Sequence, residues 1–353
     1  MYLFIRSHYM RACALTDIGE FTYIERDRPD VSSDEVLVRI DRVGICGSDI
    51  HYYQHGENSG NVVEFPHVLG HESAGTVVDI GADVQSVAPD DQVAVEPGLP
   101  CGECSYCDND TYHLCKDMEY MSSPPADGAL VEYVAWPEGF VYELPKSVSL
   151  HEGALAEPLS VALHACERGG VSDGDSVLAT GGGPVGQLVA EVALARGASD
   201  LVLTDIVDSK LRLAEQRGVD HAVNVGSDDP VEVIESRVDP DGVDIVIESS
   251  GADPAIETAT DAVKRGGDVV FVGIPIDASL PTDVVGIIGE EHDLKGSFRF
   301  SGTYPDAIEG IRTGRYDVDS IVSFERGFDE TQAAFDAAAK PENVKGVIRV
   351  SDE

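Results

Sequence analysis

The chain has 353 residues, more than a single hydrophobic core usually holds, so we expect two folded domains. Its 65 acidic residues against 24 Lys and Arg give a formal net charge of -41, which argues against nucleic acid as a partner. No apolar run approaches the roughly eighteen residues of a membrane span, and no cleavable leader is recognisable, whether the chain starts at Met1 or at Met10. We therefore expect a cytoplasmic protein.

The acidic residues are spread along the whole chain instead of forming a tail. Asp supplies 37 of them, while Lys occurs only seven times. Such a surface repels itself in dilute salt, where the Debye length is long, but it is screened and stays hydrated in molar salt. The composition therefore predicts a protein of a salt-loving (halophilic) cytoplasm.

The first third of the chain is predicted to be rich in β-strands. Residues 35–40 alternate apolar and polar side chains, as a half-buried strand does, and shorter strands are expected at 73–79 and 92–95. Gly and Pro interrupt the sequence at short intervals between them. This pattern is typical of a small barrel, whose first strand would begin at Met10.

Two motifs in this β-rich part supply three side chains that can bind a metal. One motif contains Cys46, and the other contains His71 and Glu72. A thiolate, an imidazole and a carboxylate suit a zinc ion that keeps one position open. Ser48 and His51 lie beside the thiolate, where they could hand on a proton. Either Cys46 or His71 alone would more simply be a core residue, so the prediction depends on the motifs together.

A run of four cysteines is the most specific single motif. Cys101, Cys104, Cys107 and Cys115 follow the spacing C-x2-C-x2-C-x7-C. Four thiolates spaced in this way can surround one ion tetrahedrally, as structural zinc prefers. Redox-active or unused cysteines are the alternative, whereas a DNA-reading zinc ribbon would carry basic residues where this loop carries acids. We predict a structural zinc.

The residues after Glu157 change in character. Strands are expected at 176–180, 201–204, 244–248 and 268–272, with helices at 184–196 and 209–217. Strands that alternate with amphipathic helices indicate a doubly wound parallel sheet. A final strand at 346–350 is expected to rejoin the first domain. Glu157 is a fourth candidate ligand at the domain junction, facing the interdomain cleft, although an exposed acid there is about as plausible.

A glycine-rich turn follows the first strand of this second part and opens a helix. Its G-x-G-x-x-G pattern predicts contacts with a pyrophosphate at the helix amino terminus. The candidate cofactor-binding residues here are Gly181, Gly183, Pro184, Val185 and Gly186.

Two charged residues further along the chain bear on which cofactor this turn binds. Asp205 ends the next strand, where a carboxylate would bind both ribose hydroxyls and repel a 2′-phosphate. Lys210 is the nearby cation. These residues favour NAD over NADP.

Together these motifs resemble the zinc-dependent medium-chain dehydrogenases, over essentially the whole chain after Met10. Further segments are similar to the polyol branch of that family, the sorbitol and xylitol dehydrogenases. They are residues 51–56, 124–128, 157–164 and 298–300.

The resemblance implies an α/β protein of two domains. The first is a GroES-like β-barrel catalytic domain formed by residues 1–158 and 300–353, with the structural zinc lobe at about 98–116. The second is a Rossmann domain with a doubly wound parallel sheet, residues 159–299. It also implies a homotetramer, or a dimer, with NAD and two zinc ions per subunit.

The resemblance also assigns roles to single residues. Cys46, His71 and Glu72 match the catalytic zinc ligands of the polyol enzymes, and Glu157 matches a carboxylate that acts on the same zinc through water. Ser48 matches the hydroxyl that accepts the proton, with His51 as the next station. Tyr53 and Arg299 match substrate-pocket positions. The chain departs from the common pattern at Phe300, Ser301, Tyr120 and Met121, which leaves the particular polyol open.

The function that follows is oxidation of a secondary hydroxyl of a sorbitol-like or xylitol-like polyol to a ketose, with NAD as hydride acceptor. The enzyme alternatives on the same scaffold are an aldose 1-dehydrogenase, such as a glucose dehydrogenase, and a threonine dehydrogenase. From a different class, the chain could be a zinc-stabilised nucleotide-binding protein without catalysis. The joint presence of six residues argues against that class: Cys46, Ser48, His71, Glu72, Glu157 and Arg299.

Overall fold

The computed structural model describes residues 8–275 and 283–351. The chain divides into two compact units. Unit 1 comprises Met1–Glu157, Tyr304–Arg312 and Val322–Glu353, and unit 2 comprises Pro158–Thr303 and Thr313–Ile321.

The division differs from the expected boundaries, because Pro158, residues 300–303 and residues 313–321 belong to unit 2. Arg217 of unit 2 donates to the Asp317 carbonyl oxygen at 2.9 Å, and Glu191 accepts a hydrogen bond from the Asp317 amide at 2.9 Å. These contacts tie the segment to unit 2.

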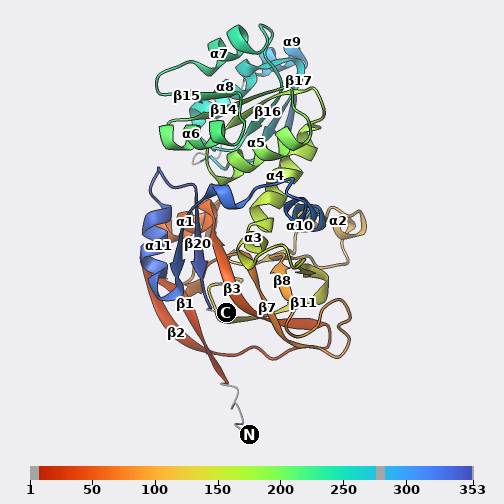
Figure 1. The fold of residues 1–353 in the computed structure, drawn as a ribbon, viewed down its shortest axis with the longest axis vertical. Helices are drawn as coiled ribbons and strands as arrows, with labels where there is room; N and C mark the ends of the chain where they lie inside the picture. Colours follow the sequence, from red (N-terminus) through yellow and green to blue (C-terminus); the bar gives the residue numbers. More distant parts are fainter. Residues whose placement is uncertain (1–7, 276–282, 352–353) are drawn as a thin grey trace. The chain divides into compact units, whose positions relative to one another are not determined.

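Unit 1 is built on a seven-stranded sheet in the order β12-β8-β7-β3-β20-β19, with β11 also paired to β3. The strands are β3 (Glu35–Ile45), β7 (Glu72–Ile80), β8 (Gln92–Val95), β11 (Tyr133–Pro137), β12 (Val141–Glu143), β19 (Val322–Gly327) and β20 (Lys345–Arg349). The expected strands at 35–40, 73–79 and 92–95 are confirmed as parts of β3, β7 and β8. The C-terminal strand β20 lies beside β3, which confirms its predicted return to the first part of the chain (Figure 1).

Smaller elements complete unit 1. A three-stranded sheet has the order β2-β1-β6, and the pairs β4–β5 and β9–β10 form hairpins. These strands are β1 (Tyr9–Asp17), β2 (Glu20–Asp27), β4 (Glu57–Asn58), β5 (Asn61–Val62), β6 (His67–Val68), β9 (Gly98–Leu99) and β10 (Glu119–Tyr120). The helices are α1 (Gly47–His55), α2 (Ser105–Asp108), α3 (Leu150–Ala154), α10 (Tyr304–Arg312) and α11 (Thr331–Ala338). Apolar side chains from both sheets, among them Leu15 of β1 and Ile40 of β3, form one buried core that also includes Leu130.

Unit 2 contains a six-stranded parallel sheet in the order β15-β14-β13-β16-β17-β18. The strands are β13 (Ser176–Thr180), β14 (Asp200–Asp205), β15 (His221–Asn224), β16 (Val243–Glu248), β17 (Val263–Phe271) and β18 (Asp293–Gly296). The helices are α4 (Ala156–Gly169), α5 (Pro184–Ala195), α6 (Asp208–Gln216), α7 (Pro230–Arg237), α8 (Asp253–Ala262) and α9 (Val284–Glu290). Strand β13 is fully buried, as expected for a sheet covered on both faces. This is the doubly wound sheet that the sequence predicts.

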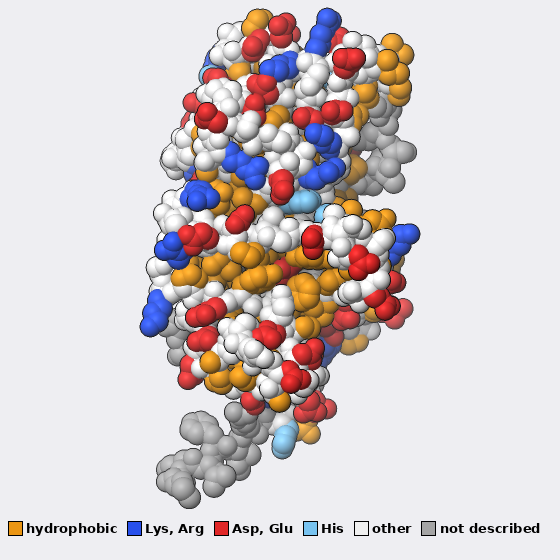
Figure 2. All heavy atoms as spheres, turned by 90° about the vertical axis from the view of Figure 1, so that its right-hand side faces the viewer, with side chains coloured by type: hydrophobic (Ala, Val, Ile, Leu, Met, Phe, Trp, Pro, Cys, Tyr) orange, Lys and Arg blue, Asp and Glu red, His pale blue; other side chains and the backbone are white. Residues whose placement is uncertain are grey.

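The described residues include no helix that is both long and apolar enough to cross a membrane. Acidic side chains are spread over the face shown in Figure 2 instead of gathering in one patch.

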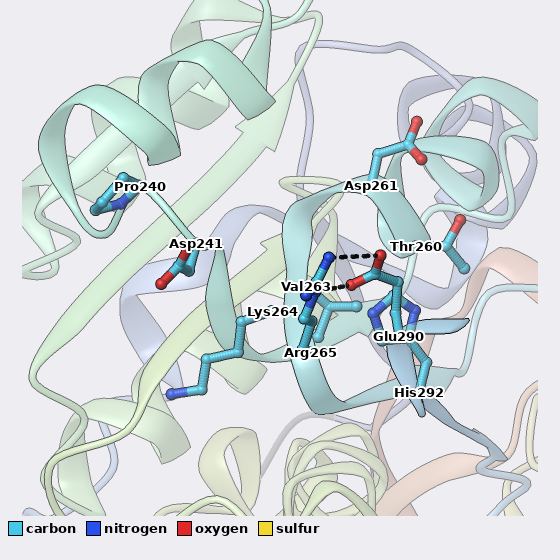
Figure 3. Close-up of a pocket in the computed structure, with 9 residues that line it drawn as sticks. All are labelled: Pro240, Asp241, Thr260, Asp261, Val263, Lys264, Arg265, Glu290 and His292. Carbon is cyan, nitrogen blue, oxygen red and sulfur yellow. Dashed lines mark hydrogen bonds and ion pairs between the residues drawn. The ribbon is translucent and has the colours of Figure 1, made fainter. Parts of the chain in front are cut away.

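A pocket of about 710 Å³ opens in unit 2 at the amino ends of its last strands (Figure 3). Asp241 precedes β16, Val263 begins β17 and His292 precedes β18, and all three line the pocket. Arg265 and Glu290 form an ion pair within it. Nucleotides bind at the carboxyl edge of doubly wound sheets, which is the opposite edge. None of the candidate site residues lines this pocket.

Candidate metal centres and nucleotide loop

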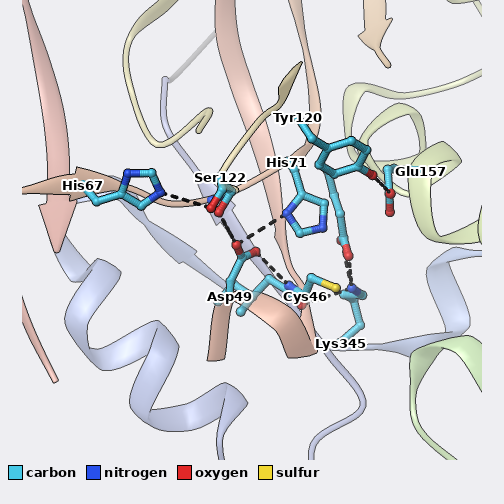
Figure 4. A network of polar contacts seen from close by, with 11 residues as sticks. Cys46, Asp49, His67, His71, Tyr120, Ser122, Glu157 and Lys345 are labelled. Atoms are coloured by element: carbon cyan, nitrogen blue, oxygen red, sulfur yellow. Dashed lines mark hydrogen bonds and ion pairs between the residues drawn. The ribbon is translucent and has the colours of Figure 1, made fainter. Parts of the chain in front are cut away.

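Strand pairing brings the three candidate ligands of the first metal centre together. Strand β3 ends at Ile45, and Cys46 follows as the cap of α1. Strand β7 runs antiparallel to β3 with Glu72 opposite Gly44, so His71 directly precedes β7 and Glu72 begins it, next to the end of β3. The ligand atoms of Cys46, His71 and Glu72 all lie within 4.8 Å of one another. Figure 4 shows Cys46 and His71 in this cluster.

Gly44 is required for this arrangement. A Cβ atom at residue 44 would lie 1.9 Å from Glu72 Oε2, which is far inside van der Waals contact. Only glycine therefore leaves space for the Glu72 carboxylate beside the ligands.

A buried carboxylate lies behind His71. Asp49 is fully buried, and its Oδ1 lies 3.4 Å from His71 Nδ1, which leaves Nε2 as the nitrogen that would face a metal. Ser122 Oγ donates to the same Asp49 oxygen at 2.5 Å. Burial alone would lower the pKa of His71, but the negative charges of Asp49 and Cys46 hold that pKa well above its usual value. A carboxylate in this position orients a histidine ligand and strengthens its basicity.

A buried lysine pairs with Glu72. Lys345 Nζ lies 2.6 Å and 2.8 Å from the two Glu72 carboxylate oxygens and donates to the Ile45 carbonyl at 3.0 Å. Both side chains are about 1% exposed. Burial would lower the pKa of Lys345, but the Glu72 carboxylate raises it above its usual value, so the pair is ionic. The carboxylate is thus neutralised before any metal arrives.

Glu157 lies beside this cluster but outside its three-ligand set. It is 3% exposed, and its Oε1 accepts a hydrogen bond from the Tyr120 hydroxyl at 2.8 Å. Burial raises the pKa of Glu157 to about 7. The expected role of Glu157 as a further, indirect ligand stays a prediction.

Ser48 and His51 lie on α1 next to the cluster. Ser48 is half-buried in the first turn of the helix, whereas His51 is exposed, with its ring centroid 5.9 Å from that of His55. The proton relay through these two residues stays a prediction.

In the structure, two residues that are predicted to contact substrate instead make contacts with neighbouring protein side chains. Tyr53 stacks on Phe21 at 5.5 Å between ring centroids, and its hydroxyl donates to Asp336 Oδ1 of α11 at 2.7 Å. These contacts pack α1 against its neighbours in unit 1. Arg299 belongs to unit 2, has a left-handed φ of 53°, and lies with its guanidinium 4.7 Å from the Phe298 ring centroid. For both residues, contact with substrate stays a prediction.

The four-cysteine lobe forms a second cluster. The sulfur atoms of Cys101, Cys104, Cys107 and Cys115 all lie within 4.8 Å of one another, and none of them is in a disulfide. The Cys104–Cys107 and Cys101–Cys107 sulfur distances are 3.5 Å and 3.9 Å. Zn–S bonds of about 2.3 Å in a tetrahedron place sulfurs roughly 3.8 Å apart. The lobe therefore fits a tetrahedral zinc.

The glycine-rich turn lies between β13 and α5. Gly181 has a left-handed φ of 83°, and a Cβ atom at Gly186 would lie 1.7 Å from the Gly181 carbonyl oxygen. Gly183 caps the helix, and Pro184 and Val185 begin it, so backbone amides face the position where a phosphate would bind. These contacts explain the glycines at 181 and 186, whereas a Cβ atom at Gly183 would meet nothing within 4 Å.

Asp205 ends β14 beside this turn. Its Oδ2 accepts a hydrogen bond from the Gly182 amide at 2.7 Å, and its Oδ1 accepts one from the Val207 amide at 2.8 Å. Lys210 lies on α6, and its Cβ would be 3.0 Å from a Cβ at Gly182. The structure thus brings Asp205 and Lys210 to the glycine-rich turn.

Sequence reasoning gave no role to Asp49, Lys345 or Tyr120 in the first metal centre. Asp49 lies within the Cys46 motif, and a carboxylate so close to a candidate ligand is a signal for a residue that orients a metal ligand. Lys345 lies 273 positions from Glu72, and no local pattern connects the two.

Comparisons with known proteins agree with this geometry. Residues 32–146 match the alcohol dehydrogenase GroES-like domain, and residues 184–313 match the zinc-binding dehydrogenase domain, which confirms the predicted fold class. The chain is 37% identical to sorbitol dehydrogenase of Bacillus subtilis over 334 residues, covering 95% of each protein.

Solved structures are similar over almost the entire chain. The structure of L-idonate 5-dehydrogenase from Escherichia coli has a TM-score of 0.90 and 30% identity, covering 97% of this chain and 98% of that one. A zinc-binding dehydrogenase from Sinorhizobium meliloti, bound to NADP, has a TM-score of 0.90 and 30% identity, covering 97% of this chain and 99% of that one.

Proposed function

The chain belongs to the zinc-dependent medium-chain alcohol dehydrogenase family, and we propose that it oxidises a secondary hydroxyl of a polyol to a ketose with NAD as hydride acceptor. The observation that carries this proposal is the Cys46, His71 and Glu72 cluster, in a chain so similar to a sorbitol dehydrogenase. Sorbitol-like and xylitol-like polyols are the proposed substrates.

The donor sets suit two zinc ions per subunit. Cys46, His71 and Glu72 would hold the catalytic ion, and the four cysteines would hold the structural one. The catalytic zinc, when bound, supplies a Lewis acid that makes the substrate hydroxyl more acidic. Asp49 orients His71, and Lys345 balances the charge of Glu72.

Ser48 is the proposed acceptor of the hydroxyl proton. Its Oγ takes the proton of the substrate hydroxyl and passes its own towards His51 and solvent. NAD, when bound, would accept the hydride of the carbinol carbon, so that the secondary alcohol would become a ketone. Tyr53, Glu157 and Arg299 are proposed to contact the substrate.

NAD is the proposed cofactor because of Asp205. A carboxylate tied to the glycine-rich turn would bind the ribose hydroxyls and repel the 2′-phosphate of NADP. Lys210 is the cation that would favour NADP, and Asp208 beside it offsets its charge. The Sinorhizobium relative was solved with NADP, so the choice needs a direct comparison of both cofactors.

A homotetramer, or a dimer, is proposed from the exposed edge of unit 2. Within the described residues, strand β18 ends the sheet, and its outer edge could pair with a second copy. Apolar side chains nearby are largely exposed: Val284 is 58%, Val285 80% and Ile288 71% accessible.

A cytoplasm rich in salt is proposed from the net charge of -41.

An activity screen in molar KCl tests the function. Sorbitol, xylitol, glucose, galactose and threonine are each offered with NAD and with NADP, and reduced cofactor is measured. We expect turnover of a polyol with NAD, and loss of it in Cys46→Ser while the fold and the lobe zinc remain. Cys166→Ala, a buried cysteine outside both clusters, is the matched control and should keep its activity. Glucose, galactose or threonine as the sole substrate would refute the polyol proposal.

A further inference from the structure

Resting on the proposed catalytic metal, we propose that Tyr120 is a positioning residue that holds Glu157 off that metal and so keeps a coordination position open. The Tyr120 hydroxyl donates to Glu157 Oε1 at 2.8 Å, and its ring centroid lies 5.7 Å from that of His71 (Figure 4). Tyr120 therefore contacts both a candidate ligand and the carboxylate beside the cluster.

The cysteine lobe determines where Tyr120 lies. Tyr120 is in β10, which pairs antiparallel with β9 so that Tyr120 lies opposite Gly98. A Cβ atom at Gly98 would be 3.2 Å from Tyr120 Cδ2, so glycine there lets the ring lie close against the partner strand. The Met121 amide donates to the Pro97 carbonyl at 3.0 Å and closes the same hairpin. The two strands bracket the four cysteines, so a folded lobe holds the backbone of Tyr120 in place.

The hydrogen bond from Tyr120 determines whether the Glu157 carboxylate stays beside the metal site or coordinates the metal. This carboxylate is buried, lies near the negative Glu72, and is outside the set of ligand atoms within 4.8 Å of one another. A buried carboxylate that loses a donor must find another partner, because leaving it unpaired is costly. Without the Tyr120 hydroxyl, the positive groups that act on Glu157 are His71 and Lys345, which already pair with Asp49 and Glu72, so a bound metal would be the remaining cation. Glu157 would then occupy the position that substrate needs.

Cobalt substituted for zinc at the catalytic site reports directly on whether Glu157 coordinates the metal, because its visible absorption depends on its ligands. The difference in visible absorption between the protein and its Cys46→Ser variant isolates the catalytic cobalt from the lobe. Tyr120→Phe keeps the ring and removes the hydroxyl. Because Glu157 would then bind the cobalt, we expect the ligand-field bands to change. We also expect cobalt release to a chelator to slow by roughly tenfold, which is the free energy of about one hydrogen bond to a charged group. Tyr112→Phe is the matched control in the same lobe, because Tyr112 donates to Glu96 at 2.8 Å instead.

A second background shows whether Tyr120 acts through Glu157. In Glu157→Gln, adding Tyr120→Phe should leave bands and release rate unchanged. Unchanged bands in Tyr120→Phe alone, an equal change in Tyr112→Phe, or the same change in the Glu157→Gln background would each overturn the inference. If Cys46→Ser leaves the cobalt spectrum unaltered, the catalytic metal site itself is wrong, and this inference falls with it.

Discussion

The seven cysteines have very different surroundings. Cys13 and Cys166 are fully buried, and burial raises their pKa values to about 11 and about 12. In the lobe, the backbone amide of Cys107 and further hydrogen bonds lower the pKa of Cys104 to about 7. Since the thiolate is the reactive form, one lobe sulfur is nucleophilic near neutral pH and the buried ones are not.

This contrast predicts how the metal-free protein reacts with iodoacetamide. After chelation, Cys104 should be alkylated first, at a rate that rises as the pH passes about 7, while Cys13 and Cys166 stay unmodified in the folded protein. Zinc in the lobe should protect Cys104. Peptide mass spectrometry measures each site. Equal labelling of Cys104 with and without zinc would contradict a metal in the lobe.

Among the secondary-structure elements, the pairing of β20 with β3 matters most to the first metal centre. It buries Lys345 against Glu72 with two contacts below 3 Å, and both charges are removed from water. Removing one partner of such a pair leaves an uncompensated buried charge, whereas removing both does not.

Lys345→Met should therefore lower the free energy of unfolding by about 3–5 kcal/mol. The double variant Lys345→Met/Glu72→Gln should recover much of that loss, because the carboxylate charge is gone. Lys340→Met, at an exposed lysine, is the matched control and should change stability by less than about 0.5 kcal/mol. Denaturant unfolding in high salt gives these values. A single variant as stable as the control would mean that the pair is not buried and ionic in solution.

Residue patterns within short segments predicted the strands and turns whose formation depends on neighbouring residues in the sequence. The apolar-rich pattern of residues 35–40 identified β3, and the glycine spacing identified the turn before α5, since Gly181 and Gly186 are required by their own backbone contacts. The contacts that organise the metal centre join residues far apart in sequence, such as Lys345 with Glu72 and Tyr120 with Glu157. Only the folded sheet order brings these residues together, so periodicity and spacing could not reveal them.

At the scale of the whole molecule, the charge of -41 is the dominant property. Acidic side chains are spread over the face in Figure 2, so their repulsion acts across the surface and not at one site. Salt screens charges beyond a Debye length of about 10 Å at 0.1 M and about 3 Å at 1 M.

The free energy of unfolding should therefore rise steeply between about 0.1 M and molar KCl, because screening relieves the native repulsion. Thermal unfolding followed by circular dichroism over a KCl series measures this, with a less acidic bacterial relative as the control. Equal stability at both ends of the series would contradict adaptation to a salt-rich cytoplasm.

Hydride transfer from a polyol to NAD is tested most directly with a labelled substrate. Xylitol or sorbitol carrying deuterium on its secondary carbinol carbons is incubated with the zinc-loaded protein and NAD in molar KCl, and the mass of the reduced cofactor is measured. We expect NADH heavier by one deuterium, together with a ketose, and no NADH from Cys46→Ser. Unlabelled NADH, or none with either polyol, would contradict oxidation at a secondary carbon.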